Sequence, residues 1–216
     1  MDLTLLALTT QAAVGVILSV LCVIMILAVI KAQHVFELRR MSESDKAGAE
    51  GEQAAAELIA GLLAPGDRMF TNLVVNYNGK RTELDNVIVN NNGAFIIEVK
   101  NYSGELVGGV DDFEWTKYHK SAAGITYQKT VKNPIKQVRR QVYILAGLLR
   151  ESGINVRVRG YALFLQHNCP VESQFVLESI EDIDQLLHGK HRSRINDKTV
   201  EAIADCLEHL PEYVYS

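Results

Sequence analysis

The sequence predicts an α/β domain, in which helices flank a central mixed sheet, preceded by one N-terminal transmembrane helix. Three observations lead to this prediction. An uncharged apolar run occupies residues 12–30, near the start of the 216-residue chain. Apolar residues recur at helical spacing within residues 47–64 and 134–150, as they do on the buried face of a surface helix. Between these segments, alternating apolar stretches separated by turn signals indicate strands.

The apolar run is long enough to cross a membrane. Residues 12–30 (AAVGVILSVLCVIMILAVI) number 19, and about 20 apolar residues span a bilayer core as a helix. No formal charge occurs between residues 3 and 30, no basic segment precedes them, and no small-residue cleavage site follows, which argues against a secretory signal peptide. A buried core helix of this length normally carries a charged face. We therefore expect residues 3–30 to lie in a lipid bilayer.

The charges beside this run predict its orientation. Asp2 precedes it, whereas Lys31, Arg39 and Arg40 follow it. Because basic residues stay on the cytoplasmic side of a membrane span, the C-terminal part should be the cytoplasmic domain of a single-pass protein in the cell's inner or plasma membrane. The expected divisions are a transmembrane anchor, a charged juxtamembrane linker and a domain of ordinary size, over residues 1–31, 32–46 and 47–216.

The first half of the domain is expected to form a helix followed by three antiparallel strands. Ala55, Ile59 and Leu62 share one face of the helix, which Pro65 and Gly66 end, since neither residue favours continuation of a helix. An Asn-Gly pair at residues 78–79 is a hairpin signal, and a second turn follows before residue 94. The expected helix is 47–64, and the expected strands are 72–77, 82–89 and 94–100.

Beyond residue 100, shorter strands and further helices are expected. Gly108 and Gly109 separate two short strands. Pro134 fits the first turn of a helix, where its missing N–H costs nothing. A β-rich apolar stretch near residue 160 indicates a buried strand. The expected strands are 105–107, 113–117 and 156–166, and the expected helices are 134–150, 180–187 and 198–210.

Charge is distributed unevenly along the domain. The net charge of −4 excludes a globally basic nucleic-acid binder. Residues 117–150 nevertheless contain eight Lys or Arg and no acid, and residues 171–187 contain five acids and no base. Two solvated faces of opposite sign would explain this pattern, as would a basic stripe that faces phosphates. The three cysteines have no zinc-site spacing, and without a disulfide framework they fit a reducing cytosol.

Three polar residues interrupt the apolar pattern of the central strands. Asp85 lies in the middle of TELDNVIV, and a buried carboxylate requires partners. Thirteen residues later, Glu98 and Lys100 follow in AFIIEVKNY and share one face of their strand, because alternate side chains do so. One turn joins the two strands, so the hairpin can bring all three side chains together. The simpler interpretation of Glu98 and Lys100 is a structural ion pair.

A further carboxylate lies on the preceding helix. Glu52 has helical spacing with Ala55 and Ile59, which places it on or near the buried face. The alternative interpretation is an acid of the first helical turn, favoured there by the helix dipole. If Glu52 does point inward, it approaches the strands that carry the other polar residues.

This set of residues suits a site for Mg²⁺ or Mn²⁺. Both ions prefer oxygen ligands, and a bound metal polarises a phosphoryl oxygen and activates water. In this interpretation Asp85, Glu98 and the backbone carbonyl of Val99 bind the metal. Glu52 contributes through a water or a second metal, and Lys100 positions the nucleophile and stabilises developing charge.

A basic helix follows, beginning in NPIKQVRRQ at residues 133–141. Gln137 and Gln141 lie one turn apart on it, beside its apolar face. Next to a metal site, its basic residues could hold a phosphate backbone; without such a site, they form the solvated side of an ordinary amphipathic helix. The candidate nucleic-acid-binding residues are Lys132, Lys136, Arg139, Arg140 and Gln141.

Taken together, these motifs resemble the nuclease-related domain (NERD) family. The resemblance covers about residues 46–150, and it rests on the order of several short motifs. These are G-x-x-G-E at 48–52, E-L-D at 83–85, I-E-V-K-N at 97–101, a tryptophan at 115 and N-P-x-x-Q at 133–137.

The resemblance implies a restriction-endonuclease-like fold of the PD-(D/E)xK superfamily and a Mg²⁺-dependent DNA-cleaving ancestry. It therefore favours DNA over RNA as the partner. By position, it implies that Asp85, Glu98 and Lys100 form the catalytic triad. Glu52 and Gln137 match the flanking polar positions and join the candidate catalytic residues.

Three functions remain open from the sequence. The first is a membrane-anchored, metal-dependent nuclease that hydrolyses nucleic-acid phosphodiesters on the cytoplasmic side. The second is a catalytically silent scaffold that uses the same fold to hold nucleic acid or protein at the membrane. The third is a structural domain in which Asp85, Glu98 and Lys100 form a buried charge network, which is costly unless fully paired.

Overall fold

The computed structural model describes residues 22–23, 25–26, 29, 46–121, 124–191 and 194–210. The chain divides into two units, Met1–Ala47 and Gly48–Ser216. In the first unit, the five described residues between 22 and 29 are helical and exposed. The rest of the expected transmembrane run, and the linker up to residue 45, lie outside the described residues. Within the described part of the chain, no helix has both the length and the apolar character needed to cross a membrane.

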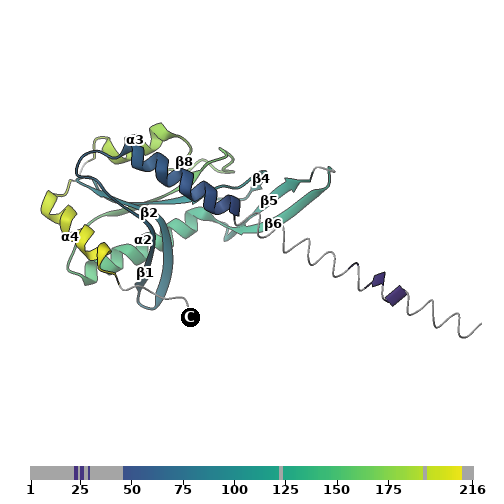
Figure 1. The fold of residues 1–216 in the computed structure, drawn as a ribbon, viewed down its shortest axis with the longest axis horizontal. Helices are drawn as coiled ribbons and strands as arrows, with labels where there is room; N and C mark the ends of the chain where they lie inside the picture. The colour runs from purple at the N-terminus through teal and green to yellow at the C-terminus, as the bar shows by residue number, and fades with distance from the viewer. Residues whose placement is uncertain are drawn as a thin grey trace, which may run out of the picture. The chain divides into compact units, whose positions relative to one another are not determined.

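The second unit is built on a mixed sheet of five strands (Figure 1). Three antiparallel neighbours, β1, β2 and β3, are followed by β7, which is parallel to β3, and by β8, which is parallel to β7. The α/β fold with a mixed central sheet, expected from the sequence, is therefore confirmed. In order across the sheet, the strands are β1 (Arg68–Tyr77), β2 (Lys80–Asn90), β3 (Gly93–Lys100), β7 (Val158–Phe164) and β8 (Val176–Leu177).

Helices cover both faces of this sheet (Figure 1). On one face, α2 (Pro134–Glu151) and α4 (Asp197–Glu208) pack against a core that includes Ile96. On the other face, the helix over residues 46–62 and α3 (Ile180–His188) pack against a core that includes Ile97. The two isoleucines are neighbours on β3, and successive side chains of a strand point to opposite faces. Every residue of β3 except Lys100 is buried, as expected for a central strand.

A second sheet of three strands is inserted between β3 and α2. It consists of β4 (Glu105–Val107), β5 (Glu114–Lys120) and β6 (Thr126–Lys132), paired antiparallel in that order. Its base is fixed by Trp115, which is 1% exposed and packs with residues of α2 and β7. The far end of the β5–β6 hairpin projects from the unit (Figure 1).

The base of this inserted sheet is held mainly by Asn133. Its side-chain oxygen caps α2 by accepting the N–H groups of Ile135 and Lys136. Its amide nitrogen donates to three carbonyl oxygens of the loop between β4 and β5, at 2.8–3.2 Å. The Trp115 Nε1 group donates to one of the same carbonyls, that of Gly109, at 2.8 Å. The buried side-chain amide of Asn133 therefore holds both the start of α2 and the loop between β4 and β5.

The largest differences between the observed and the expected strands are at β1, β6 and β8. β1 begins at Arg68 rather than residue 72, because Asn72 has a φ of 52° and interrupts the alternation by which a strand is recognised. β6 was not expected, since a strand in a projecting hairpin buries no continuous apolar face. β8 was not expected either, because it has two residues, too few to show a pattern.

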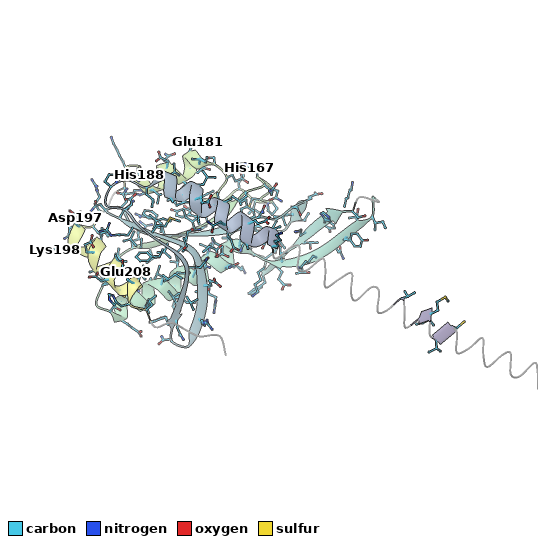
Figure 2. All side chains as sticks on the ribbon, viewed as in Figure 1. His167, Glu181, His188, Asp197, Lys198 and Glu208 are labelled. Atoms are coloured by element: carbon cyan, nitrogen blue, oxygen red, sulfur yellow. The ribbon has the colours of Figure 1, made fainter. Side chains whose placement is uncertain are left out.

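A histidine connects α3 to the start of β1, and its protonation is expected to affect stability. His188, labelled in Figure 2, contacts Asp67 at 3.0 Å and Asp184 at 2.9 Å. Its hydrogen bonds with Asp67 and then Asp184 raise the pKa of His188. A group with a raised folded-state pKa stabilises the fold fully below its unfolded pKa, and this contribution disappears as pH rises through the folded pKa.

We therefore expect His188→Gln to lower the free energy of unfolding by about 1 kcal/mol near pH 5.5 and by much less near pH 9. Urea denaturation at both pH values measures the difference. His167→Asn is a suitable control, because His167 is exposed (Figure 2) and its φ of 49° is tolerated by Asn. An equal loss at both pH values would show that the histidine contributes only through packing.

Candidate functional site

β2 departs from regular pairing at Asp85. On the β1 side, regular pairs lie above and below Asp85, but the pair it would form with Asn72 is missing. Asn72 has a φ of 52° there, a left-handed conformation that Asn adopts more readily than most residues. The ladder between β1 and β2 is therefore interrupted at this one position, while the pairs above and below it keep the same register.

On the β3 side, the pairing stops just before Asp85. The last pair is Asn86↔Ile97, and the next would join Asp85 to Glu98. The Asp85 Oδ2 atom instead accepts the backbone N–H of Val99 at 2.7 Å. Because the N–H and C=O of one residue in an extended strand face the same side, the Val99 carbonyl is directed toward Asp85 as well. An aspartate side chain thus replaces part of the sheet's hydrogen bonding.

Glu98 is enclosed by hydrogen-bond donors from two elements. Its side chain is buried, with 2% of its surface exposed. Oε1 accepts from Lys100 Nζ at 2.6 Å and also from Gln137 Nε2. Oε2 accepts from Gln141 Nε2 at 2.5 Å. The two glutamines lie one turn apart on α2, so this helix and the end of β3 hold the carboxylate between them.

Lys100 is a cation in this site rather than a base. Burial alone would lower the pKa of Lys100, but attraction to Glu98, Tyr102 and Asp85 outweighs burial and raises it. Burial also raises the pKa of Tyr102, and Lys100 opposes this increase. At neutral pH an ammonium group therefore faces the carboxylates beside a neutral phenol. Such a group can orient a ligand oxygen and stabilise negative charge, but it does not remove protons.

Asp85 is strained electrostatically. Burial and then repulsion by Glu98 raise the pKa of Asp85 from 3.8 to about 7, against the opposing effects of the Val99 N–H and Lys100. Asp85 therefore retains a proton at pH values where an ordinary aspartate is fully ionised. A bound divalent cation would reverse the repulsion between the carboxylates, and so would favour the ionised form of Asp85.

Glu52 approaches the same residues from the helix over residues 46–62. Burial raises the pKa of Glu52, as does repulsion by Glu98 and Glu83, while Lys100 lowers it. Glu52 and Asp85 both line a pocket of about 540 Å³ between this helix and the strands. The structure therefore brings together five of the residues singled out from the sequence: Glu52, Asp85, Glu98 and Lys100, together with Gln137, which donates to Glu98.

The approach of Glu52 depends on the glycine before it. A Cβ atom on Gly51 would lie 2.7 Å from Cβ of Asn101, which follows β3. Asn101 in turn accepts a hydrogen bond from Gln166 Nε2 at 2.9 Å. Only a glycine allows the helix this close to the end of β3.

We therefore expect Gly51→Ala to destabilise the unit by about 1–3 kcal/mol, because it overfills a packed contact. Gly48→Ala is the matched control on the same helix: nothing lies within 4 Å of its Cβ position, so the alanine should stabilise by up to about 1 kcal/mol. Thermal unfolding of both variants measures the contrast. If Gly51→Ala leaves thermal stability unchanged, the helix can shift away from Asn101 without loss of stability.

The oxygen atoms of these residues are of the kind that binds a hard metal ion, but the side chains are not arranged around a common metal position. Among the residues that the structure describes, no group of three His, Cys, Asp or Glu side chains converges on a common point. Glu98 is directed to three N–H donors, and one oxygen of Asp85 to a fourth. The second Asp85 oxygen and the Val99 carbonyl lie where β2 and β3 separate, and oxygen atoms are the ligands that Mg²⁺ and Mn²⁺ prefer.

The basic residues expected to bind nucleic acid do not form one stripe. Lys132 is exposed on β6. Lys136 Nζ lies 3.8 Å from the ring centre of Phe113, and Arg140 donates to the Arg81 carbonyl at 3.1 Å. On a helix, positions 136 and 140 flank position 137 on one side, so these two residues border the side of α2 that faces Glu98.

Arg139 and Gln141 lie elsewhere. The Arg139 guanidinium stacks over Phe175, 4.9 Å from the ring centre, on the opposite side of α2 from Gln137. Gln141 is 0% exposed and donates to the Glu83 carbonyl at 3.0 Å as well as to Glu98. A side chain enclosed in this way does not reach a ligand at the surface. Its observed role is to hold Glu98, which corrects its place among the nucleic-acid contacts.

Three residues help to build the site in roles that the sequence did not indicate. Tyr102 lies next to Lys100, Gly51 admits the helix, and Asn133 anchors α2. Each belongs to or adjoins a motif already recognised: E-V-K-N-Y, G-x-x-G-E and N-P-x-x-Q. A glycine before a site acid, and an asparagine before the proline that opens a helix, were the available signals.

The fold and the polar cluster define an α/β domain that carries a buried carboxylate–lysine pair at the end of a central strand. The family model described as NERD, nuclease-related domain, matches residues 47–165, more than half of the chain, so the chain belongs to this family. The match runs from the helix that carries Glu52 to the end of β7. Comparison with curated proteins and with solved structures gave no significant match.

Proposed function

We propose that this protein is a membrane-anchored, metal-dependent nuclease that hydrolyses phosphodiester bonds of nucleic acid, with DNA as the main substrate. The observation that carries the proposal is the separation of β2 from β3 at Asp85. There an aspartate, a backbone carbonyl and the Glu98–Lys100 pair meet beside the pocket that Glu52 lines. Membership of the nuclease-related family supports the same chemistry.

The residues would have separate roles in this activity. Asp85, Glu98 and the Val99 carbonyl would hold Mg²⁺ or Mn²⁺, and Glu52 would bind through a water. The bound ion would polarise the phosphoryl group and make water more acidic. Lys100 orients the attacking water and stabilises negative charge, since its ammonium group is retained at neutral pH.

Other residues support this arrangement and the substrate. Gln137 and Gln141 fix the orientation of Glu98 through their hydrogen bonds. Lys136 and Arg140 border the same side of α2, and Lys132 is exposed on the strand before it. These three cations are suited to contact the phosphate backbone, which positions a nucleic acid without reading its sequence.

The proposal includes the membrane anchor predicted from the sequence. Residues 3–30 are uncharged, and the basic residues follow them. Val23, Met25, Ile26 and Val29 are helical and 53–62% exposed, as residues facing lipid would be. The nuclease domain would then act on the cytoplasmic side of the inner or plasma membrane.

A cleavage assay with the full chain in neutral detergent tests the proposal. Plasmid DNA, single-stranded DNA and RNA are incubated with Mg²⁺, Mn²⁺ or a chelator. We expect cleavage only with metal, and a loss of about 10²-fold or more in Lys100→Met, because a charge-stabilising group is removed. Lys198→Met is the control, since Lys198 is exposed at the start of α4 (Figure 2). Unchanged cleavage in folded Lys100→Met would overturn the assignment of Lys100.

The second candidate is a scaffold that binds nucleic acid or protein without cleaving it. It is favoured by the complete hydrogen bonding of Glu98, whose two oxygens are already satisfied by Lys100, Gln137 and Gln141. A scaffold would bind nucleic acid in a salt-sensitive way, and its binding would survive loss of the acids.

Metal binding separates the two candidates. If the carboxylates bind metal, millimolar Mg²⁺ or Mn²⁺ should stabilise the parent by about 1–3 kcal/mol, because a ligand that binds only the native state raises its stability. Asp85→Asn should lose this gain, while Asp111→Asn, a change at an exposed acid, should keep it. Thermal unfolding with and without metal gives the answer. No gain in the parent would favour the scaffold.

A further inference from the structure

Among the residues that the structure describes, no strand pairs with one edge of β7 in its N-terminal half. On one side, β7 pairs with β3 along its whole length, from Val158 to Phe164. On the other side, β8 pairs only with Ala162 and Leu163. The Ala162 N–H donates to the Phe175 carbonyl on this second side. Because backbone groups of alternate residues point the same way, Gly160 and Val158 direct theirs to the edge that β8 leaves open.

A groove of about 320 Å³ runs along this open edge. Arg139 of α2 lies on one side of the sheet, stacked over Phe175. Arg159 lies on the other side, where it stacks over Phe95 at 5.3 Å and donates to the Asn92 carbonyl at 2.8 Å. Arg157 also lines the groove, and no Asp or Glu is among the described residues that line it. The groove therefore has cations on both faces of the sheet edge.

The groove carries an excess of positive charge. Burial lowers the pKa of Arg159, and repulsion by Arg157 lowers it further. Burial raises the pKa of Tyr161, the next residue on that face, and the two arginines oppose this. Carboxylates placed between the arginines would relieve the repulsion and form charge-assisted hydrogen bonds, which are stronger than neutral ones.

We propose that this groove binds an extended acidic peptide of a partner protein, which adds to the sheet as a strand beside β7. The open edge presents both N–H and C=O groups, and a peptide backbone can pair with both. Phosphates and nucleic-acid backbones offer acceptors and would leave the carbonyls unpaired. Successive side chains of an added strand alternate between faces, so neighbouring acids would meet Arg139 on one face and Arg157 with Arg159 on the other.

This site is distinct from the Glu98 cluster and does not depend on the proposed nuclease activity. Arg139 lies on the opposite side of α2 from Gln137, which binds Glu98. Unpaired strand edges are also places where chains aggregate, and edge charges oppose this. The arginines would repel the same basic edge of a second copy, which protects against aggregation. They would also attract an acidic strand, which makes the edge selective for an acidic partner.

Fluorescence anisotropy with the full chain tests the proposal. The probe is a fluorescein-labelled peptide, Glu-Glu-Val-Glu-Glu-Val-Glu, and its analogue with N-methylated backbone amides. We expect Arg139→Glu/Arg157→Glu to weaken binding of the first peptide by about tenfold or more. Arg150→Glu, an exposed change on the same helix, should leave it within about twofold. The N-methylated peptide should bind at least about tenfold more weakly, because it cannot donate to strand carbonyls.

Three results would overturn the proposal. Equal binding of the N-methylated peptide would exclude strand addition. Equal weakening by Arg150→Glu would show attraction to net charge alone. A single-stranded oligonucleotide that competes with the peptide, and that loses as much affinity in the double variant, would assign the groove to nucleic acid. Circular dichroism of each variant confirms that the fold is retained, and Arg157→Ala alone provides a milder change at an exposed position.

Discussion

Replacing Asp85 with Asn is expected to raise the free energy of unfolding by about 2–4 kcal/mol near pH 8. The native carboxylate is buried beside Glu98, and these two effects raise the pKa of Asp85 to about 7. Asn has the same shape, can accept the Val99 N–H through its carbonyl oxygen, and carries no charge. The substitution therefore removes a repulsion while keeping the hydrogen bond.

The protonation of Asp85 determines how the free energy of unfolding changes with pH. Between pH 3.8 and about pH 7, the folded chain keeps a proton on Asp85 that the unfolded chain has lost. The contribution of Asp85 to stability therefore falls as pH rises through this range and is constant above it. The parent and Asp85→Asn should have similar stability near pH 4, and the difference should be largest near pH 8.

Urea denaturation of the full chain across this range measures the effect. Asp111→Asn is the control, because Asp111 is exposed and its change should leave the decline in place. A decline of the same size in Asp85→Asn would show that other groups cause it. A gain in stability combined with a loss of metal binding would identify Asp85 as a residue kept for function at the expense of stability.

Removing Glu98 is expected to have the opposite effect. Glu98→Ala should lower the free energy of unfolding by about 3–5 kcal/mol, because it leaves the buried ammonium of Lys100 without its partner. It also leaves the amide groups of Gln137 and Gln141 without an acceptor. Of the two neighbouring carboxylates, Glu98 thus stabilises the fold, whereas Asp85 destabilises it.

A double-mutant cycle checks this assignment. Lys100→Met in the Glu98→Ala background should restore part of the stability, because it removes the unpaired charge. Glu105→Ala, a change at an exposed acid on β4, should alter stability by less than about 0.5 kcal/mol. If Glu98→Ala costs less than about 1 kcal/mol, the hydrogen bonds around Glu98 contribute little.

The sequence predicted the central elements well, because their patterns come from burial. The strands around Asp85 and Glu98 contain runs of buried apolar residues. The Asn78–Gly79 pair adopts φ values of 50° and 70°, as its hairpin turn requires. The helix from Pro134 follows from its proline and its apolar spacing. Elements without a buried face, such as β6, carried no comparable signal.

The sequence predicts which residues form the candidate site, but it does not predict all of the contacts that they make. Asp85, Glu98 and Lys100 break the apolar pattern of their strands, and this is visible without a structure. Nothing in the spacing shows that Gln141 turns inward to Glu98 or that Arg139 turns away to Phe175. These directions depend on how α2 packs across the sheet, which is set by residues distant in sequence.

Because of where the second sheet is inserted, the β5–β6 hairpin can change in evolution independently of the contact between Glu98 and Gln137. Asn133 and Trp115 close the insertion at its base, so the end of β3 and the start of α2 remain together whatever lies between them. The entropic cost of closing a loop grows only slowly with its length. Relatives of this domain can therefore lengthen, shorten or recharge the β5–β6 hairpin without moving Glu98 relative to Gln137. Such a hairpin is a place where the surface of the domain can diverge while the polar cluster at the end of β3 is preserved.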